Sequence, residues 1–483
     1  MPLILPGNVA AAPAATTYDV ANSCRFDDGS STRMTKTPGS DGDLDNWTFS
    51  CWVKRGNITT GTAQCIFSCD VDSSTNYGKL VFDTSDRIEF HNSTGGVVDK
   101  LITNRVFRDC SAWLHIVVVW DSDNGTEAQR MRLYVNGTEE SSFNTANYPT
   151  SGLNSAWNQD SVHSIGDYNS GQYFDGYIAE AVFTDGQVYA ASDFGEFDTD
   201  NSPNIWKPKD VSGLTFGGNG AYLDFEDSGN LGDDESGNGN DWSETNIAAA
   251  DQATDSPTNS FCTLNNLDNY YAGSTFSEGN CKIVGHSSRS SYNTGTIGLS
   301  AGKWYFEVKQ GVVAGTGSEY YAHVGIETIP STSTSNSAGI NTYSSNYSSY
   351  DGDHYHDTGG SGDNDDFGDT YTDGDIVSVA LDLDNNRVYY AKNGTWQNSQ
   401  DPTDGTNALT ITAPASTDSG VYFPAIGDRT AAKYYTWEAN FGGCPAFTVS
   451  SSNADDNGYG NFEYDVPAGY LAICTKNLGS DGG

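Results

Sequence analysis

Positive charge is scarce in this sequence of 483 residues. Lysine and arginine together number 23, against 64 aspartate and glutamate residues, so the formal net charge is −41. A surface this acidic repels phosphate backbones and anionic lipid, which argues against binding to nucleic acid or to a membrane surface. We expect most of the excess carboxylates to keep the protein soluble, with binding of cations as the alternative.

Long hydrophobic runs are also missing. No stretch reaches the ~18 apolar residues that a membrane-spanning helix needs, so no membrane insertion is expected. Residues 1–17 are apolar, but the first positive side chain is Arg25, and Pro2 and Pro6 interrupt any early helix, which argues against a secretory signal. We expect this segment to be an arm that docks on another subunit; the alternatives are a frayed tail or an arm folded on its own domain. The residues expected to dock are Leu3, Ile4, Leu5 and Val9.

The nine cysteines lack the spacing of a zinc site. Only Cys65 and Cys69 lie close together, without the second pair that such a site needs. Most of the others fall inside apolar stretches, such as Cys51 in TFSCWV and Cys474 in YLAICT. We therefore expect free, buried thiols in a protein made in a reducing cytoplasm.

What the sequence has instead is glycine, small polar residues and aromatics. Its 54 Gly, 28 Tyr and 21 Phe are typical of an all-β protein with many turns. In the first half, strand-like stretches such as 47–54 and 113–121 follow one another at short spacing, and Asn136 and Gly137 form a hairpin-type turn. This pattern predicts a β-sandwich, with 190–197 as its one short helix.

The second half contains a three-strand meander over residues 367–394. The apolar run 376–383 has the length of a strand, Asp384-Asn385-Asn386 reverses the chain into 388–390, and Asn393 and Gly394 reverse it again. Near the end, 462–474 is expected to add one more strand.

Both halves resemble known families. The meander, with G-x-W-Y-F-E-V at 302–308 and the strands at 321–326, 420–427 and 437–442, resembles a SPRY domain. The first half is similar to laminin G-like or pentraxin-like domains in its blocks TFSCWVK, W-x-H-I-V-V-V-W-D, L-Y-V-N-G, I-G-D-Y and Y-F-D-G-Y-I-A-E-A-V-F. These resemblances imply concanavalin A-like β-sandwiches that bind partners through surface loops.

The expected architecture is therefore all-β, with two concanavalin A-like antiparallel β-sandwich (jelly-roll) domains in tandem and an extended N-terminal arm. The expected boundaries are 1–17 for the apolar docking arm, 18–200 for the laminin G-like sandwich, 201–255 for a linker and connecting strand, and 256–483 for the SPRY-like sandwich with its C-terminal strand.

The combination also resembles virion proteins of tailed bacteriophages of the marine type. It shares with them the start MPLILPGNVA, the connector that ends in S-G-N-G-N-D-W, the segment 254–261 and the ending P-A-G-Y-L-A-I-C-T-x-N-L. The resemblance implies a structural protein on the exterior of the virion, on the tail or the capsid surface, made in the host cytoplasm. It would be a tail-fibre-like adhesin that binds host surface polysaccharide, or a capsid decoration or fibre-assembly protein without glycan binding. Its partners would be other virion proteins and copies of itself, and a trimer would suit a fibre.

No catalytic residues are predicted. Retaining β-glucanases of the concanavalin A-like fold need Glu-x-Asp-x-x-Glu on one strand, which places two carboxylates ~5 Å apart. The nearest approaches, 196–201 and 463–465, lack the final glutamate. The motifs G-x-S-x-G and H-E-x-x-H and a phosphate loop are missing as well.

The Gly-, Asp- and Asn-rich run that ends at Trp242 is a candidate calcium site. Asp233, Asp234 and Asp241 offer hard oxygen ligands, but the run lacks the order of an EF-hand, and a solvated cluster of turns is the alternative. The sequence establishes no cofactor with certainty, and calcium is a candidate.

A second candidate metal site follows Tyr350. Asp351 and Asp353 precede His354 and His356, which point the same way on an extended segment and could chelate a transition metal with an aspartate. The alternative is a long exposed loop with its histidines in water.

The same loop is the expected recognition surface, because SPRY partners usually contact such loops. Tyrosine offers a large contact area at low entropy cost and stacks on sugar rings. This prediction fails if Tyr350 and Tyr355 are buried in the core of their own domain or in a subunit contact. The residues concerned are Tyr343, Tyr347, Tyr350, His354, Tyr355 and His356.

Overall fold

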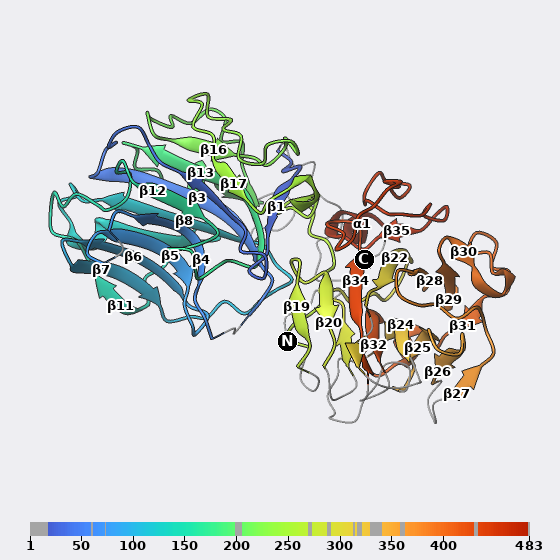
Figure 1. The fold of residues 1–483 in the computed structure, drawn as a ribbon. Coiled ribbons are helices and arrows are strands. Elements are labelled where there is room, and N and C mark those ends of the chain that lie inside the picture. The colour runs from blue at the N-terminus through green and yellow to red at the C-terminus, as the bar shows by residue number, and fades with distance from the viewer. Residues whose placement is uncertain are drawn as a thin grey trace. The chain divides into compact units, whose positions relative to one another are not determined.

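The computed structural model describes residues 18–58, 61–72, 74–198, 205–268, 273–286, 291–312, 314–315, 321–328, 341–357, 363–428 and 433–481. Strands joined by turns dominate this part of the chain, as Figure 1 shows. It divides into two compact units, with the boundary between Thr258 and Asn259. The expected docking residues Leu3, Ile4, Leu5 and Val9 lie outside the described residues. None of the described helices is long and apolar enough to cross a membrane.

The first unit is a sandwich of two eight-stranded antiparallel sheets. Its first sheet has the order β10-β9-β8-β3-β13-β1-β18, with β16 paired to β13, and its second has the order β11-β7-β6-β5-β4-β12-β2-β17. The first sheet consists of β1 (Ser23–Phe26), β3 (Asn46–Arg55), β8 (Leu114–Asp121), β9 (Met131–Val135), β10 (Thr138–Glu139), β13 (Gly176–Asp185), β16 (Ala221–Leu223) and β18 (Gln252–Ala253). The second consists of β2 (Arg33–Lys36), β4 (Gln64–Asp70), β5 (Tyr77–Phe82), β6 (Ile88–Thr94), β7 (Val97–Thr103), β11 (Phe143–Asn147), β12 (Val162–Ile165) and β17 (Ser243–Thr245). The short pair β14 (Gly195–Phe197) and β15 (Trp206–Pro208) and the 3-10 turns η1 (Glu127–Gln129), η2 (Ala191–Asp193) and η3 (Ala249–Asp251) complete the unit.

Aromatic rings fill the space between these two sheets. Trp47 of β3 stacks on Trp120 of β8 with ring centroids 6.4 Å apart, and Phe49 stacks on Phe67 of β4 at 4.2 Å. All four side chains are buried in one core cluster. Since successive side chains of a strand point to opposite faces, these residues fix which face of each sheet is turned outward.

The outer face of the first sheet is covered by the segment expected to be a linker. Val117, Val119 and Val182 point away from the core, and a second apolar cluster that includes Phe216 and Tyr222 buries them. Strands β16, β17 and β18 of the same segment also extend both sheets. Residues 205–255 therefore belong to the first unit, which differs from the expected linker at 201–255, because the apolar outer face of β8 and β13 needs a cover.

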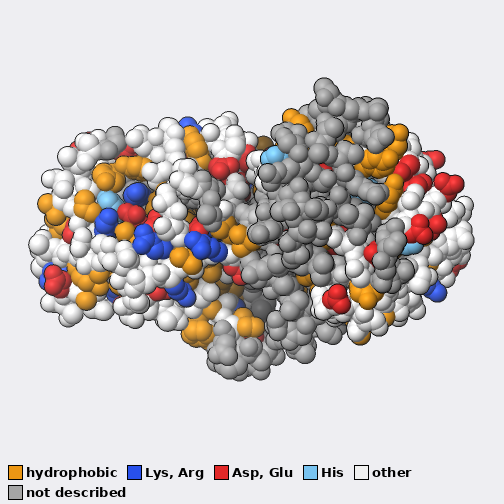
Figure 2. Space-filling view, turned by 90° about the horizontal axis from the view of Figure 1, so that it is seen from below, with side chains coloured by type: hydrophobic (Ala, Val, Ile, Leu, Met, Phe, Trp, Pro, Cys, Tyr) orange, Lys and Arg blue, Asp and Glu red, His pale blue; other side chains and the backbone are white. Residues whose placement is uncertain are grey.

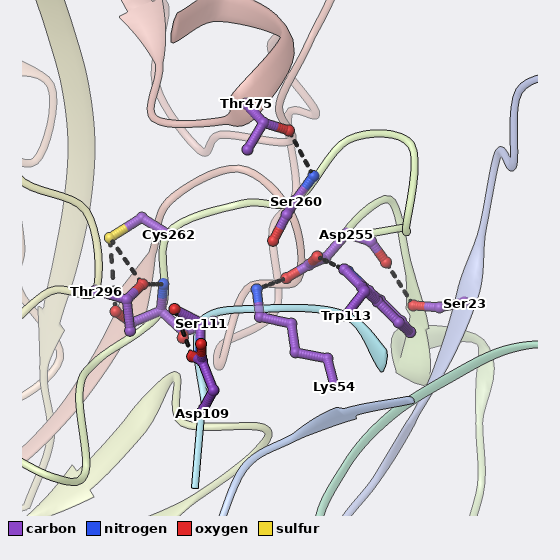
Figure 3. A network of polar contacts seen from close by, with 11 residues as sticks. Ser23, Lys54, Asp109, Ser111, Trp113, Asp255, Ser260, Cys262, Thr296 and Thr475 are labelled. Carbon is purple, nitrogen blue, oxygen red and sulfur yellow. Dashed lines mark hydrogen bonds and ion pairs between the residues drawn. The ribbon is translucent and has the colours of Figure 1, made fainter. Parts of the chain in front are cut away.

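A buried polar network fixes the end of this segment (Figure 3). The Lys54 ammonium lies 2.7 Å from the Asp255 carboxylate, and both side chains are 1% exposed. Trp113 Nε1 donates to the same carboxylate at 3.0 Å, and Ser23 Oγ donates to the Asp255 carbonyl at 2.6 Å. The first unit thus extends in sequence at least to Asp255.

The second unit is built on a nine-stranded and a six-stranded sheet. The larger has the order β19-β20-β34-β22-β28-β29-β30, with β31 paired to β29 and β35 to β22; the smaller has the order β21-β32-β24-β25-β26-β27. The larger consists of β19 (Thr275–Ser277), β20 (Lys282–Val284), β22 (Lys303–Gln310), β28 (Ile376–Asp382), β29 (Arg387–Lys392), β30 (Thr395–Trp396), β31 (Leu409–Thr410), β34 (Thr436–Asn440) and β35 (Leu471–Ala472). The smaller consists of β21 (Tyr292–Thr294), β24 (Ala322–Glu327), β25 (Ser345–Ser348), β26 (His354–His356), β27 (Asp363–Asp365) and β32 (Phe423–Asp428). The pair β23 (Ala314–Gly315) and β33 (Lys433–Tyr434), the 3-10 turns η4 (Gln397–Ser399) and η5 (Pro414–Ser416) and the helix α1 (Thr475–Asp481) lie outside these two sheets.

The predicted meander is confirmed as β28, β29 and β30. Asn393 and Gly394 both have positive φ, 49° and 76°, as a two-residue hairpin turn requires. The predicted C-terminal strand is present as β35, which runs parallel to β22. Two local expectations were incomplete: 190–197 holds only a 3-10 turn followed by a strand, and α1 after β35 was not predicted.

Candidate binding face of the first unit

One continuous row of polar side chains crosses the outer face of the second sheet. Each member of the row lies directly opposite the next on the neighbouring strand, and each is next in sequence to a core residue, as Ser164 is to Ile165. The row therefore lies on the face turned away from the core. In the order β7, β6, β5, β4, β12, β2, β17 its members are Lys100, His91, Lys79, Ser68, Ser164, Thr35 and Ser243.

The middle of this row forms part of a groove. Ser68, Ser164 and Thr35 lie side by side on β4, β12 and β2, and the loop that follows β12 adds further polar groups. The cavity has a volume of about 290 Å³. Its lining residues are Arg33, Thr35, Ser68, Asp70, Val162, Ser164, Asp167, Asn169 and Ser170.

Asp167 is the most deeply placed charge of this groove, with 2% of its surface exposed. Its Oδ2 accepts a hydrogen bond from Ser170 N at 3.0 Å, whereas its Oδ1 has no partner among the described residues. Burial raises the pKa of Asp167, against the opposing effects of the Ser164 hydroxyl and the Arg33 charge. A buried acceptor without a partner is costly, and a hydrogen bond from a ligand would offset that cost.

The aromatic side of the face comes from Tyr77 and Tyr168. Their ring centroids lie 5.6 Å apart, and Tyr77 also stacks on His91 at 4.9 Å. Asn169 and Ser170 both have positive φ, so a tight turn presents Tyr168 at this point. Burial and the nearby Asp70 carboxylate raise the pKa of Tyr168, which stays a neutral hydrogen-bonding group. Both tyrosine rings are half-buried and present part of their surface to solvent.

The end of the row on β5, β6 and β7 carries charged side chains. Glu89 accepts a hydrogen bond from His91 Nδ1 at 3.0 Å and lies 3.9 Å from the Lys79 ammonium. Burial acts to raise the pKa of Glu89, but His91, Lys79 and Lys100 outweigh it and hold that pKa below its usual value. In the view of Figure 2, several Lys and Arg side chains gather on one face of the first unit.

The predicted recognition surface of the second unit is largely buried. Tyr347 is fully buried, with its ring 5.4 Å from Phe367, and Tyr355 is 7% exposed with its hydroxyl bonded to Asp351. His354 is 4% exposed, and burial lowers its pKa to about 3. Only three of the expected residues keep accessible surface: Tyr343, Tyr350 and His356. The expected exposure is therefore wrong for Tyr347, His354 and Tyr355, and binding of a partner by this loop stays a prediction.

This segment is buried because β25 takes part in a polar network inside the second unit. Asn346 Nδ2 donates to Glu327 Oε1 at 3.0 Å, and Asn341 Nδ2 donates to the other carboxylate oxygen at 3.2 Å. Ser345 and Ser348 are also buried. A strand whose buried side chains are polar and hydrogen-bonded lacks the alternation of apolar and polar residues that identifies a strand. Its sequence therefore resembles that of an exposed loop.

The candidate calcium ligands serve mainly as turn acceptors. Asp234 accepts from the backbone N–H groups of Tyr222, Ser236 and Asn240, and Asp241 accepts from Asp234 N. Asp233 Oδ1 accepts a hydrogen bond from Asn230 Nδ2 at 3.4 Å. This arrangement matches the alternative of a turn cluster, and calcium binding there stays a prediction.

The acidic residues before the histidines hold their own loop together. Asp351 accepts from the Tyr355 hydroxyl and from Asp353 N, and Asp353 accepts from Asn364 Nδ2 at 2.6 Å. His354 and His356, by contrast, are brought together with Asp365.

One acidic cluster was not foreseen. Carboxylate oxygens of Asp27, Asp28 and Asp175 lie within 4.8 Å of one another in the first unit. Burial, followed by the charge of Asp27, raises the pKa of Asp28. The cluster could not be found from the sequence, because Asp175 reaches the other two only through the pairing of β1 with β13.

Comparison with known proteins agrees with the two-sandwich architecture. Residues 28–191 match the laminin G-like family model described as the concanavalin A-like lectin/glucanases superfamily, and residues 303–442 match the SPRY domain. No curated protein matches the chain.

Similar solved structures include three β-sandwich proteins. The SPRY domain of human HERC1 is 14% identical (TM-score 0.25, covering 33% of this chain and 86% of that one). The native heptameric SAP-like pentraxin from Limulus polyphemus is 14% identical (TM-score 0.26, 35% and 77%), and domains LG4-5 of the mouse laminin α1 chain are 11% identical (TM-score 0.29, 86% and 84%). On the strength of the family matches and the two observed sandwiches, the chain carries a laminin G-like, concanavalin A-like domain and a SPRY domain in tandem.

Proposed function

We propose that this protein is a non-catalytic adhesin whose first unit binds a glycan chain across its second sheet. The observation that carries the proposal is the polar row from Lys100 to Ser243, with the groove beside Asp167 at its middle. Neighbouring strands lie about 4.8 Å apart, so a row across seven strands spans about 29 Å, which is long enough for several sugar rings.

The chemistry of this face favours a glycan over other ligands. Sugar hydroxyls both donate and accept hydrogen bonds, and the groove offers hydroxyls, an amide, carboxylates and a guanidinium. Tyr77 and Tyr168 offer ring surface on which a sugar can stack. A protein partner would need a more apolar centre, and the net charge of −41 opposes nucleic acid.

The sequence resemblance extends this proposal to the virion of a tailed bacteriophage. In this interpretation the protein is a tail-fibre-like adhesin on the virion exterior, attached through residues 1–17 to other virion proteins and assembled as a homo-oligomer. The alternative is a capsid decoration or fibre-assembly protein without glycan binding. Immunogold electron microscopy of purified particles separates the two: label on the tail supports the adhesin, label on the capsid supports the decoration protein, and unlabelled particles contradict both.

Binding of the purified full-length protein to immobilised bacterial surface polysaccharides tests the glycan proposal. Tyr168→Ala removes the aromatic side of the face and is expected to weaken binding about tenfold, because such a contact contributes about 1.5 kcal/mol. Tyr464→Ala, at a half-buried tyrosine of the second unit outside both candidate binding surfaces, is the matched control and should bind like the wild type. A folded protein that binds none of the polysaccharides, or equal binding by both variants, would refute the proposed site.

A further inference from the structure

Two histidines and an aspartate come together at the edge of the smaller sheet of the second unit. His354 and His356 lie two residues apart on β26, and Asp365 on the edge strand β27 lies directly opposite His354. Residues two apart on a strand share a face, and so do residues directly opposite each other. One ring nitrogen of each histidine and one carboxylate oxygen of Asp365 lie within 4.8 Å of one another.

The three side chains form a compact group that solvent can reach. The two imidazole rings stack with centroids 4.7 Å apart and an angle of 19° between their planes. His356 Nε2 lies 3.1 Å from Asp365 Oδ2. The His356 side chain is 22% exposed and that of Asp365 is 74% exposed, so a cation has access from the side of β27.

The hydrogen bonds around His354 fix its tautomer. The Tyr390 hydroxyl donates its proton to the Ser345 carbonyl at 2.8 Å, so its contact with Ser345 Oγ at 3.0 Å requires the serine to be the donor. With its only proton committed, Ser345 Oγ accepts from His354 Nε2–H at 2.8 Å. The lone pair of His354 is therefore on Nδ1. Metal-binding histidines use an acceptor of this kind on the far ring nitrogen to hold their orientation.

We propose that His354, His356 and Asp365 bind a late first-row divalent cation such as Zn²⁺. Two imidazole nitrogens with one carboxylate are a donor set typical of Zn²⁺, and three protein ligands leave a fourth position to water. The nitrogen donors select against Ca²⁺ and Mg²⁺, which prefer sets made of oxygen alone. This site is separate from the glycan groove of the first unit.

The cation would replace the hydrogen bond between His356 and Asp365 and tie β27 to β26. All three residues of β27 are exposed, and the strand forms the edge of its sheet. A three-residue polar edge strand gains little stability from its own packing, so a cation that links it to the buried His354 would stabilise it.

Titration of the full-length protein with ZnCl₂ in a calorimeter tests the site. We expect saturation at one equivalent per chain and a rise of the melting temperature with Zn²⁺ but not with Mg²⁺ or Ca²⁺. His356→Gln and Asp365→Asn remove a half-buried and an exposed ligand, both outside the apolar core, and are expected to weaken binding at least tenfold. His286→Gln, at a half-buried histidine of the same unit, is the matched control and should leave the affinity unchanged.

The position of Ser345 supplies an independent readout. Ser345→Ala removes the acceptor of His354 Nε2–H, and loss of such a partner typically weakens metal affinity 10- to 100-fold. Absorption of the Co²⁺-loaded protein should show a tetrahedral spectrum with nitrogen ligands, and His356→Gln should change it while circular dichroism reports an intact fold. Absence of saturable Zn²⁺ binding, or binding that His356→Gln and Asp365→Asn both retain, would overturn the proposal; the second result would mean adventitious binding elsewhere on this acidic chain.

Discussion

Lys54 and Asp255 form an ion pair in which both side chains are buried, although they lie 201 positions apart in the sequence. Lys54 belongs to the central strand β3, whereas Asp255 follows the last strand of the first unit, β18. Trp113 and Ser23, which also form hydrogen bonds with Asp255, belong to this unit as well. The pair therefore closes the first sandwich by joining its middle to its end.

Asp255→Ala should destabilise the first unit by about 3–5 kcal/mol, because it leaves the Lys54 ammonium buried without its carboxylate. The double variant Lys54→Met with Asp255→Leu removes both charges and should recover most of this loss. Urea unfolding of the two variants and the wild type, followed by tryptophan fluorescence, measures the difference. A double variant as unstable as Asp255→Ala would show that packing around the pair, and not the unpaired charge, sets the cost.

The boundary of the first unit gives a second prediction. A fragment of residues 18–258 should be monodisperse and show a cooperative thermal transition, whereas a fragment of residues 18–200 should aggregate. The shorter fragment lacks Phe216 and Tyr222 and therefore exposes Val117, Val119 and Val182 on the first sheet. Size-exclusion chromatography and circular dichroism of the two fragments test this. A well-folded 18–200 fragment would mean that the covering segment adds nothing essential to the sandwich.

The sequence was sufficient for features that depend on local pattern. The meander at 367–394 was predicted because its strands alternate with Asn- and Gly-containing turns that permit few other conformations. The nine cysteines were predicted to be buried from their apolar neighbours, and the structure shows all nine free and buried. One signal in the sequence was missed. The continuous apolar run from Ile116 to Trp120 indicates a strand that is buried on both faces, so it predicts that another segment of the chain covers the outer face of this sheet.

Features that depend on the pairing of distant strands could not be predicted. Ser68, Ser164 and Thr35 form one row only because β12 inserts between β4 and β2, and no local pattern contains this order. Tyr347 was misplaced for another reason: its neighbours Ser345, Asn346 and Ser348 are polar yet buried, so the strand lacks the alternation that identifies β-structure. The pairing of His354 with His356 could be predicted, because the two histidines lie two residues apart in the sequence.

The thiols provide a third prediction. Burial raises the pKa of Cys51, Cys65 and Cys474, and a thiol without its thiolate form reacts slowly. A disulfide reagent such as DTNB should therefore label the native protein only over the time of unfolding, and should label nine thiols per chain at once in denaturant without reductant. Rapid labelling of the native protein would place a cysteine at the surface. Fewer than nine thiols in denaturant would reveal a disulfide.

A buried carboxylate with two tyrosine donors makes the first unit sensitive to pH. Tyr222 donates to both carboxylate oxygens of Glu180 at 2.9 and 3.0 Å, and Tyr18 donates to Oε2 at 2.8 Å. Glu180 lies at a bulge of β13 with φ of 51°. Burial raises its pKa from 4.5 to about 7, with Asp224 and Glu226 acting in the same direction and the two tyrosine hydrogen bonds opposing it.

Because this folded-state pKa lies above the value of the unfolded chain, Glu180 favours the folded state in its protonated form. Its contribution is complete below about pH 4.5 and is lost as the pH rises through about 7, so ionisation should cost the wild type on the order of 3 kcal/mol by pH 8. Glu180→Gln cannot ionise and should lack this part of the pH dependence, becoming the more stable protein relative to wild type as the pH increases. Urea unfolding of both proteins at pH 4.5, 6, 7 and 8 measures the difference in free energy of unfolding, and other titrating groups cancel in the comparison. A difference that stays constant across this range would show that folding does not shift the pKa of Glu180, and would contradict the prediction.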